Sequence, residues 1–198
     1  MKNKKGLGGL GITLIVVGVI LLLMVFYVIG AYNRFVSLSQ GIDAKWSEVG
    51  NQYQRQADLI PNLIDVVKSS VNVETNFVKD VIAARTSWAS ASTQLAKDAA
   101  GQQMNNGISA FVSAVAENYP TLQANKQYMA LTDELSGTQN RITVARGRYI
   151  EDIKSFNIAI KRFPANILAG MFGFTQKEYY QASEGSMTTP KLGDGVLP

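Results

Sequence analysis

The chain opens with a long uncharged stretch, because no charged residue occurs between Lys5 and Arg34. Within it, residues 10–29 read LGITLIVVGVILLLMVFYVI and consist mostly of large apolar side chains. A helix rises about 1.5 Å per residue, so roughly 20 such residues cross a hydrocarbon core about 30 Å thick. The pattern predicts a transmembrane helix over residues 10–31, marked by Leu10, Ile15, Gly18, Leu22, Phe26 and Ile29.

A cleaved signal peptide is the alternative interpretation of this stretch. Signal peptides have a shorter apolar region, of about 7–15 residues, followed by a small-x-small cleavage site. The apolar run here is longer, and residues 28–31, Val-Ile-Gly-Ala, make a poor cleavage site. The sequence therefore favours a retained membrane anchor.

The charges that flank the span predict its orientation. Lys2, Lys4 and Lys5 precede it, whereas Arg34 and Lys45 follow it. Lys and Arg near the ends of a span favour the cytoplasmic side. We expect a single-pass protein of the bacterial inner membrane with its main domain on the periplasmic or extracellular side.

Helical periodicity continues after the span. Over residues 32–55, Phe35, Leu38, Ile42, Trp46, Val49 and Tyr53 recur at steps of three or four, which is the stripe of an amphipathic helix. Asp58 is a candidate N-cap and Pro61 a first-turn residue of a second helix that extends to Trp88. A polar stretch to Gly107 is either frayed helix or loop, and a third helix covers residues 108–119.

The fourth helix has the clearest pattern. Its apolar positions repeat every seven residues, as in a coiled coil, at Tyr128, Leu135, Ile142, Tyr149, Phe156 and Phe163. It is expected to end at Phe163-Pro164, since proline disfavours helix in the residue before it. Alternation typical of strands is absent from the sequence. We therefore predict an all-α protein whose transmembrane helix continues into an elongated antiparallel bundle of about four long helices.

The predicted organisation has four parts. They are a short basic N-terminal segment (1–9), the transmembrane helix (10–31), the helical bundle (32–180) and a flexible C-terminal tail (181–198). Residues 165–180 are apolar and interrupted by glycines, so they either pack on the end of the bundle, which we favour, or lie on a membrane. Phe172 and Phe174 are the candidate lipid or partner contacts in this segment.

Composition excludes several kinds of chemistry. The chain contains no Cys and no His, which removes thiol nucleophiles, disulfides, the commonest general base and the commonest zinc ligand. Its carboxylates are scattered, so we expect no catalytic, cofactor-binding or metal-binding residues. The glycine pattern at residues 6–11 matches G-x-G-x-x-G, but a membrane helix follows it and no strand precedes it, which argues against a nucleotide site.

The net charge of +4 does not indicate nucleic-acid binding. Three of the nineteen positive residues lie in the first five positions, and the rest nearly balance the fifteen negative ones. The clustered candidates are Arg141, Arg146, Arg148, Lys154, Lys161 and Arg162. We interpret them as a solvated helix face, with anionic lipid headgroups as the alternative contact.

Several short motifs, in order along the chain, resemble the LemA family of bacterial membrane proteins. They include Ala44-Lys45-Trp46-Ser47-Glu48, Asp58-Leu59-Ile60-Pro61-Asn62-Leu63, Ala84-Arg85, Ala116-Glu117-Asn118-Tyr119-Pro120, Ala145-Arg146 with Tyr149, and Phe163-Pro164. The Asp-Leu-Ile-Pro-Asn-Leu block is the most specific. Ile150 departs from the family pattern, where Asn is usual after the tyrosine, and so does Gln56, where a second basic residue is common.

The resemblance implies one N-terminal span, a domain of long antiparallel helices and no known catalytic residues. One family member is involved in forming magnetosome membranes and others are encoded near membrane proteases, which favours a role in membrane organisation or as an adaptor. The matched residues have structural interpretations, as helix caps, core positions or charges paired between helices. They are Trp46, Asp58, Pro61, Asn62, Arg85, Glu117, Pro120, Arg146, Tyr149 and Pro164.

Our main hypothesis is a non-enzymatic, self-associating scaffold that organises membrane or a membrane protein complex. Its partners would be the lipid bilayer and further copies of the chain, without nucleic acid and without a cofactor. The alternative is a monomeric or dimeric adaptor of another membrane protein, such as a membrane protease. An enzyme or small-ligand sensor is a third and weaker hypothesis, which a buried polar pocket would support.

Overall fold

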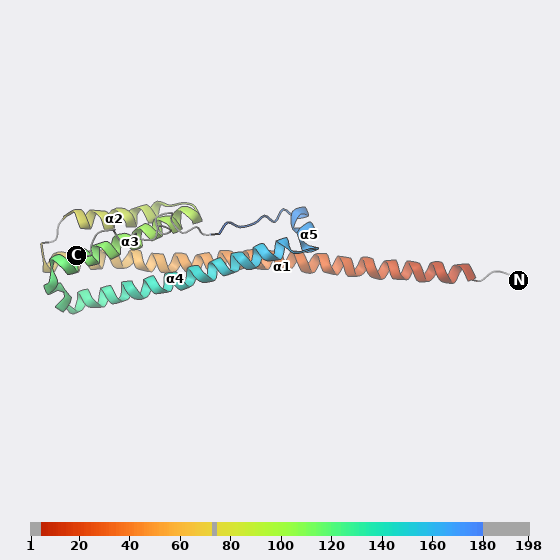
Figure 1. Ribbon diagram of the computed structural model, residues 1–198, viewed down its shortest axis with the longest axis horizontal. Coiled ribbons are helices and arrows are strands. Elements are labelled where there is room, and N and C mark those ends of the chain that lie inside the picture. The colour runs from red at the N-terminus through yellow and green to blue at the C-terminus, as the bar shows by residue number, and fades with distance from the viewer. Residues whose placement is uncertain (1–4, 73–74, 180–198) are drawn as a thin grey trace, which may run out of the picture. The chain divides into compact units, whose positions relative to one another are not determined.

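A computed structural model describes residues 5–72 and 75–179, and every regular element in this part of the chain is helical (Figure 1). The elements are α1 (Lys5–Ser70), α2 (Thr75–Ser90), α3 (Gln94–Asn118), a short 3-10 helix η1 (Pro120–Ala124), α4 (Lys126–Lys161) and α5 (Ala165–Met171). The all-α prediction is therefore confirmed. The predicted tail, residues 181–198, lies outside the described residues.

The helices form two compact units. The anchor unit consists of residues 5–44 and 151–178, so it contains the start of α1, the end of α4 and α5. The bundle unit consists of residues 45–150, where the second half of α1 meets α2, α3 and the first part of α4. Helices α1 and α4 each contribute to both units.

The bundle unit has one continuous hydrophobic core. In Figure 1, α2 and α3 lie side by side within it. The stripe predicted on α1 continues into this core through Val49 and Tyr53, both of which are fully buried. Each helix contributes buried apolar side chains, which include Ile60, Leu63, Val67, Val81, Trp88, Met104, Phe111, Val115, Leu135 and Ile142.

The anchor unit has a smaller core made from three segments. The buried side chains are Phe35 and Ile42 of α1, Ile153, Phe156, Ala159 and Ile160 of α4, and Ala169 of α5. The amphipathic stripe predicted for residues 32–55 is confirmed here, since Phe35 and Ile42 are buried while neighbouring positions on the other face are exposed.

The predicted helix boundary at Asp58 and Pro61 is wrong. Pro61 lies inside α1, which continues to Ser70. The reason is packing, because Ile60, Leu63 and Val67 extend the buried stripe across the proline and are all fully buried. Asp58 caps no helix there, and its Oδ1 instead accepts a hydrogen bond from Gln54 Nε2 at 2.8 Å.

The second helix, predicted to run from Asp58 to Trp88, is not one continuous helix. It breaks between Ser70 and Thr75, so that α1 ends and α2 runs separately to Ser90. The polar stretch that was open to two interpretations is helical from Gln94 onward, and α3 has Thr93 as its N-cap. Thr93 Oγ1 accepts a hydrogen bond from the Ala96 N–H at 3.1 Å, which satisfies one of the unpaired donors at the helix start.

The heptad pattern matches α4 in all but its last position. Tyr128, Leu135, Ile142 and Phe156 are buried, and Tyr149 is half-buried. Phe163 lies beyond the end of α4 at Lys161 and is 81% exposed. The buried seam thus stops one heptad earlier than the sequence pattern predicts.

Gly101 leaves space for the side chain of Tyr53 in the core of the bundle unit. A Cβ atom at this position of α3 would lie 2.5 to 2.9 Å from carbon atoms of the buried Tyr53 ring on α1. We expect Gly101→Ala to lower the free energy of unfolding by about 1–3 kcal/mol, because the ring has no room to move. Urea unfolding of the full chain in detergent, followed by tryptophan fluorescence, measures this change.

Gly147→Ala is the matched control for this prediction. Gly147 lies within α4, and no atom lies within 4 Å of the place where its Cβ would be. Alanine is a better helix former than glycine, so this change should stabilise the chain by up to about 1 kcal/mol. Equal effects of the two substitutions would contradict the steric explanation.

Candidate functional site

The most conspicuous surface of the described chain is the first part of α1. From Leu10 to Phe26, every large apolar side chain is at least 47% exposed. α1 is the one helix in the described residues that is long and apolar enough to cross a membrane, and none of its most apolar window is buried by the chain. An uncovered apolar surface of this size points to membrane anchoring, since it would be unfavourable in water.

Directly after this surface, five aromatic rings form a cluster in the anchor unit. They belong to Tyr32, Phe35, Phe156, Phe172 and Phe174. The Phe174 ring contacts three of the others, with centroid distances of 5.3 Å to Phe35, 5.9 Å to Tyr32 and 6.4 Å to Phe156. Phe172 packs edge-on against Tyr32 at 5.1 Å and stays 44% exposed.

A buried asparagine fixes the segment that carries these phenylalanines. Asn157 Nδ2 donates a hydrogen bond to the Lys177 carbonyl at 2.8 Å, and the Lys177 N–H donates to Asn157 Oδ1 at 2.9 Å. The asparagine side chain is only 3% exposed. Of the two candidate contact residues, Phe174 is therefore held within the cluster, while Phe172 offers part of its ring to the surroundings.

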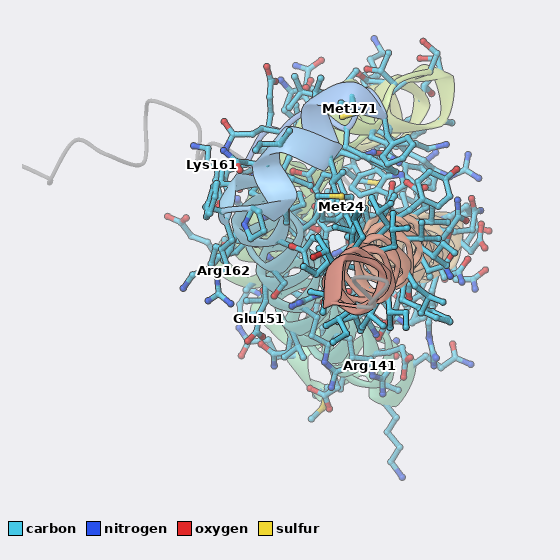
Figure 2. All side chains as sticks on the ribbon, turned by 90° about the vertical axis from the view of Figure 1, so that its right-hand side faces the viewer. Met24, Arg141, Glu151, Lys161, Arg162 and Met171 are labelled. Carbon is cyan, nitrogen blue, oxygen red and sulfur yellow. The ribbon has the colours of Figure 1, made fainter. Side chains whose placement is uncertain are left out.

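A basic pocket lies between α1 and the α4–α5 connection of the anchor unit. Its volume is about 390 Å³, and its lining includes Tyr27, Arg34, Phe35, Arg162 and Phe163. Figure 2 looks at the molecule from its N-terminal side and shows Lys161 at the end of α4 and Arg162 directly after it projecting outward, with Met171 on α5. The pocket therefore extends from the end of the apolar surface, at Tyr27, to Arg34, the first charged residue after it.

In the bundle unit, a buried polar cluster connects α1, α3 and α4. Asp98 of α3 is 3% exposed. Its Oδ1 lies 3.3 Å from Arg146 Nε of α4 and accepts a hydrogen bond from the Tyr53 hydroxyl of α1 at 3.5 Å. Next to it, Gln56 Nε2 donates to Gln139 Oε1 at 3.3 Å, again between α1 and α4.

Burial dominates the electrostatics of this cluster. It raises the pKa of Asp98 from 3.8 to about 6, although the Arg146 charge and the Tyr53 hydrogen bond both act in the opposite direction. Burying this ion pair costs desolvation energy, and removing either partner would leave a buried charge unpaired. The cluster therefore restricts which faces of α1, α3 and α4 can meet.

Asp98 is not among the residues predicted for a site, although the sequence pattern contains a signal for it. Ile108, Phe111 and Val115 form the apolar stripe of α3, and Asp98 and Asn105 lie on the same stripe when the helical period is extended backwards. Polar residues in phase with an apolar face are candidates for buried polar contacts. The expected interhelical pairing of Arg146 is confirmed by Asp98, its buried partner.

Pro61 and Arg85, both family-motif residues, are linked through the backbone. A proline has no N–H, so the carbonyl four residues before it loses its helical hydrogen bond. That carbonyl belongs to Ala57, and Arg85 Nε of α2 donates to it at 2.9 Å. The arginine thus satisfies the buried backbone acceptor that the proline leaves unpaired.

The remaining motif residues lie at separate places. Trp46 of α1 packs on Tyr149 of α4 with ring centroids 5.4 Å apart. Trp88, at the predicted end of the second helix, is 4% exposed and belongs to the bundle core. The other motif residues are Asp58 and Asn62, exposed on α1; Glu117, exposed on α3; Pro120, the first residue of η1; and Pro164, immediately before α5.

Half of the basic residues that were clustered in the sequence are neutralised by carboxylates. Arg141 lies 3.7 Å from Glu134, Arg148 lies 3.2 Å from Glu48, and Arg146 pairs with Asp98. Lys154, Lys161 and Arg162 form no ion pair within the part of the chain that the structure describes. The unpaired charge of this set is therefore confined to the anchor unit.

Acidic side chains do not gather into a metal site anywhere in residues 9–72 and 76–179. The buried carboxylate of Asp98 instead pairs with Arg146 of another helix. This pair has the character of an interhelical structural contact, whereas the basic pocket has the chemistry of a binding site.

Comparison with known proteins agrees with the motifs. Residues 45–193 match the LemA family. The chain belongs to the LemA family. Among curated relatives, magnetosome proteins MamQ 1 and MamQ 2 of Paramagnetospirillum magneticum are each 28% identical to it over 195 aligned residues, covering 84% of this chain and 72% of the relative. MamQ of Magnetospirillum gryphiswaldense is 25% identical over the same extent.

The link between Pro61 and Arg85 can be tested with a double-mutant cycle in this LemA-family protein. Arg85→Ala should lower the free energy of unfolding by about 1–3 kcal/mol, because it leaves the Ala57 carbonyl unpaired. In a Pro61→Ala background, the restored N–H of residue 61 can bond this carbonyl, so the same substitution should cost clearly less. Equal costs in both backgrounds would show that the two residues act independently.

The raised pKa of Asp98 predicts a specific dependence of stability on pH. Between about pH 4 and 6 the folded state binds more protons at this group than the unfolded state does, so its contribution to stability is greatest at acid pH. That contribution should fall by about 2–3 kcal/mol as the pH rises from 4 to 7. The measurement is the difference in unfolding free energy between wild type and Asp98→Asn across this range, and a constant difference would refute the prediction.

Proposed function

We propose that this LemA-family protein is a non-enzymatic membrane scaffold that self-associates and organises membrane or a membrane protein complex. The observation that carries the proposal is the apolar first part of α1, which no other described segment covers. A helix of this kind anchors the chain, and the all-helical units attached to it offer surfaces for protein contacts. The magnetosome proteins to which the chain is similar support a role in organising membrane.

The span has a face suited to contact with a second copy. Gly11 and Gly18 are seven residues apart and so lie on one side of α1, and no atom lies within 4 Å of the place where either Cβ would be. Small residues let transmembrane helices approach closely enough for backbone packing. We infer that copies of the chain associate along this face.

The flanking charges support placing the anchor in the bacterial inner membrane with the helical units on the periplasmic side. The orientation rule depends on residues near the span along the chain, so Lys2, Lys4 and Lys5 count against Arg34 and Lys45. Lys161 and Arg162 lie far from the span in sequence and do not enter this comparison.

An adaptor of another membrane protein is the second candidate. It is favoured by an open hollow of about 390 Å³ in the bundle unit, between α1 and α4. Glu48, Arg141 and Arg148 line it together with Val144, which is 53% exposed. A mixture of opposite charges and exposed apolar surface suits a transient protein contact.

The first test is the mass of the full chain in detergent and in nanodiscs, measured by light scattering beside a chain that begins at Tyr32. The scaffold proposal predicts a defined homo-oligomer that depends on the span. Replacing Gly11 and Gly18 with Ile should reduce its mass toward that of the monomer, because branched side chains separate the helices.

Val16→Leu combined with Ile20→Leu is the matched control, since these residues lie on the opposite side of the helix. It should leave the mass unchanged. If the protein is monomeric at all concentrations, the scaffold proposal is refuted. A specific membrane protein that co-purifies with that monomer would support the adaptor proposal instead.

A further inference from the structure

The basic pocket of the anchor unit has the position and chemistry of a lipid-headgroup site. It begins at Tyr27, near the end of the apolar run, and extends past Arg34. Seven residues of helix between these two side chains rise about 10 Å, which is comparable with the depth of a headgroup layer. We propose that this pocket binds the phosphate of an anionic phospholipid through Arg34 and Arg162, an inference that rests on the proposed membrane anchoring.

The charge around the pocket is all of one sign. Residues 6–42 and 153–176 contain four basic residues and no Asp or Glu. The basic residues are Arg34, Lys154, Lys161 and Arg162. Neither arginine of the pocket pairs with a carboxylate in the described part of the chain, so both guanidinium groups are available to an anion.

Arginine suits this role because its planar guanidinium can donate two parallel hydrogen bonds to phosphate oxygens. In Figure 2 the Arg162 side chain projects sideways from the axis of α1, which is the direction in which headgroups surround a spanning helix. Tyr27, which also lines the pocket, is 44% exposed, and tyrosine is enriched where a membrane meets water.

An apolar edge beside the pocket favours a lipid over a soluble phosphate compound. Phe163, which lines the pocket, is 81% exposed, and Ile167 and Met171 of α5 are 55% and 73% exposed. These side chains would be unfavourable in water but can enter the boundary between headgroups and acyl chains. The aromatic cluster holds the segment that follows α5 against α1, since Phe172 and Phe174 both contact Tyr32.

The zwitterionic headgroup of phosphatidylcholine also carries a phosphate, but its choline would meet Lys161 and Arg162. An anionic lipid meets the same groups with net attraction, worth about a fivefold gain in affinity for each basic residue near the surface. With two arginines, the pocket should therefore select phosphatidylglycerol over phosphatidylcholine by about 25-fold.

The test uses the full chain, reconstituted with equal amounts of phosphatidylglycerol and phosphatidylcholine that have identical acyl chains. The protein is extracted in mild detergent, and the retained lipid is identified by native mass spectrometry. Wild type should retain phosphatidylglycerol by preference. Arg34→Gln combined with Arg162→Gln should reduce this retention about 25-fold, because both phosphate ligands are removed.

The matched control is Lys79→Gln combined with Lys126→Gln. It removes the same charge from exposed positions of the bundle unit and should leave lipid retention unchanged. Equal retention by the arginine variant and wild type, or equal retention of the two lipids, overturns the proposal. Displacement of the lipid by millimolar inorganic phosphate also overturns it, since the pocket would then recognise phosphate from solution.

The same spectra separate this proposal from the scaffold proposal. The mass of the protein reports self-association, while the mass of bound lipid reports the pocket. A monomer that retains phosphatidylglycerol supports the lipid site and refutes the scaffold, whereas an oligomer without selective retention does the reverse. Matching circular dichroism spectra of the variants show that the exposed arginines are not needed for folding.

Discussion

The uncovered apolar surface of α1 is the constraint on which the rest of the molecule depends. Side chains from Leu10 to Phe26 are exposed along a helix that the chain itself does not cover. A membrane accommodates such a surface, because the backbone groups are bonded within the helix and the large apolar side chains favour hydrocarbon. Features of the anchor unit that directly follow Tyr27, namely the aromatic cluster and the basic pocket, then lie close to a bilayer.

The bundle unit is held together by two kinds of interaction with different roles. Its apolar core supplies most of the driving force for folding, since the hydrophobic effect has no preferred direction. Polar contacts between helices add selectivity: Arg146 must meet Asp98, and Arg85 must meet the carbonyl that Pro61 leaves unpaired. A rotation of either helix would leave a buried charge or backbone acceptor unsatisfied, so these contacts restrict the register of the bundle.

Several motif residues of the LemA family take part in contacts between two helices. Pro61 and Arg85 form one structural pair, Trp46 and Tyr149 a second, and Arg146 with Asp98 a third. Each pair joins two helices. Residues with such roles keep the helices in register, and the surfaces available for a partner or a lipid then lie elsewhere, as the basic pocket does.

The sequence by itself determined the features that depend on local periodicity and composition. The membrane helix, the stripe through Phe35, Val49 and Tyr53, and the heptads of α4 all follow from spacing within one segment. Only the tertiary structure decided that α1 continues through Pro61, that Asp98 is buried against Arg146, and that Arg34 and Arg162 line one pocket. The physical reason is that periodicity shows which face of a helix is apolar, whereas the partner of that face depends on how all the helices pack together.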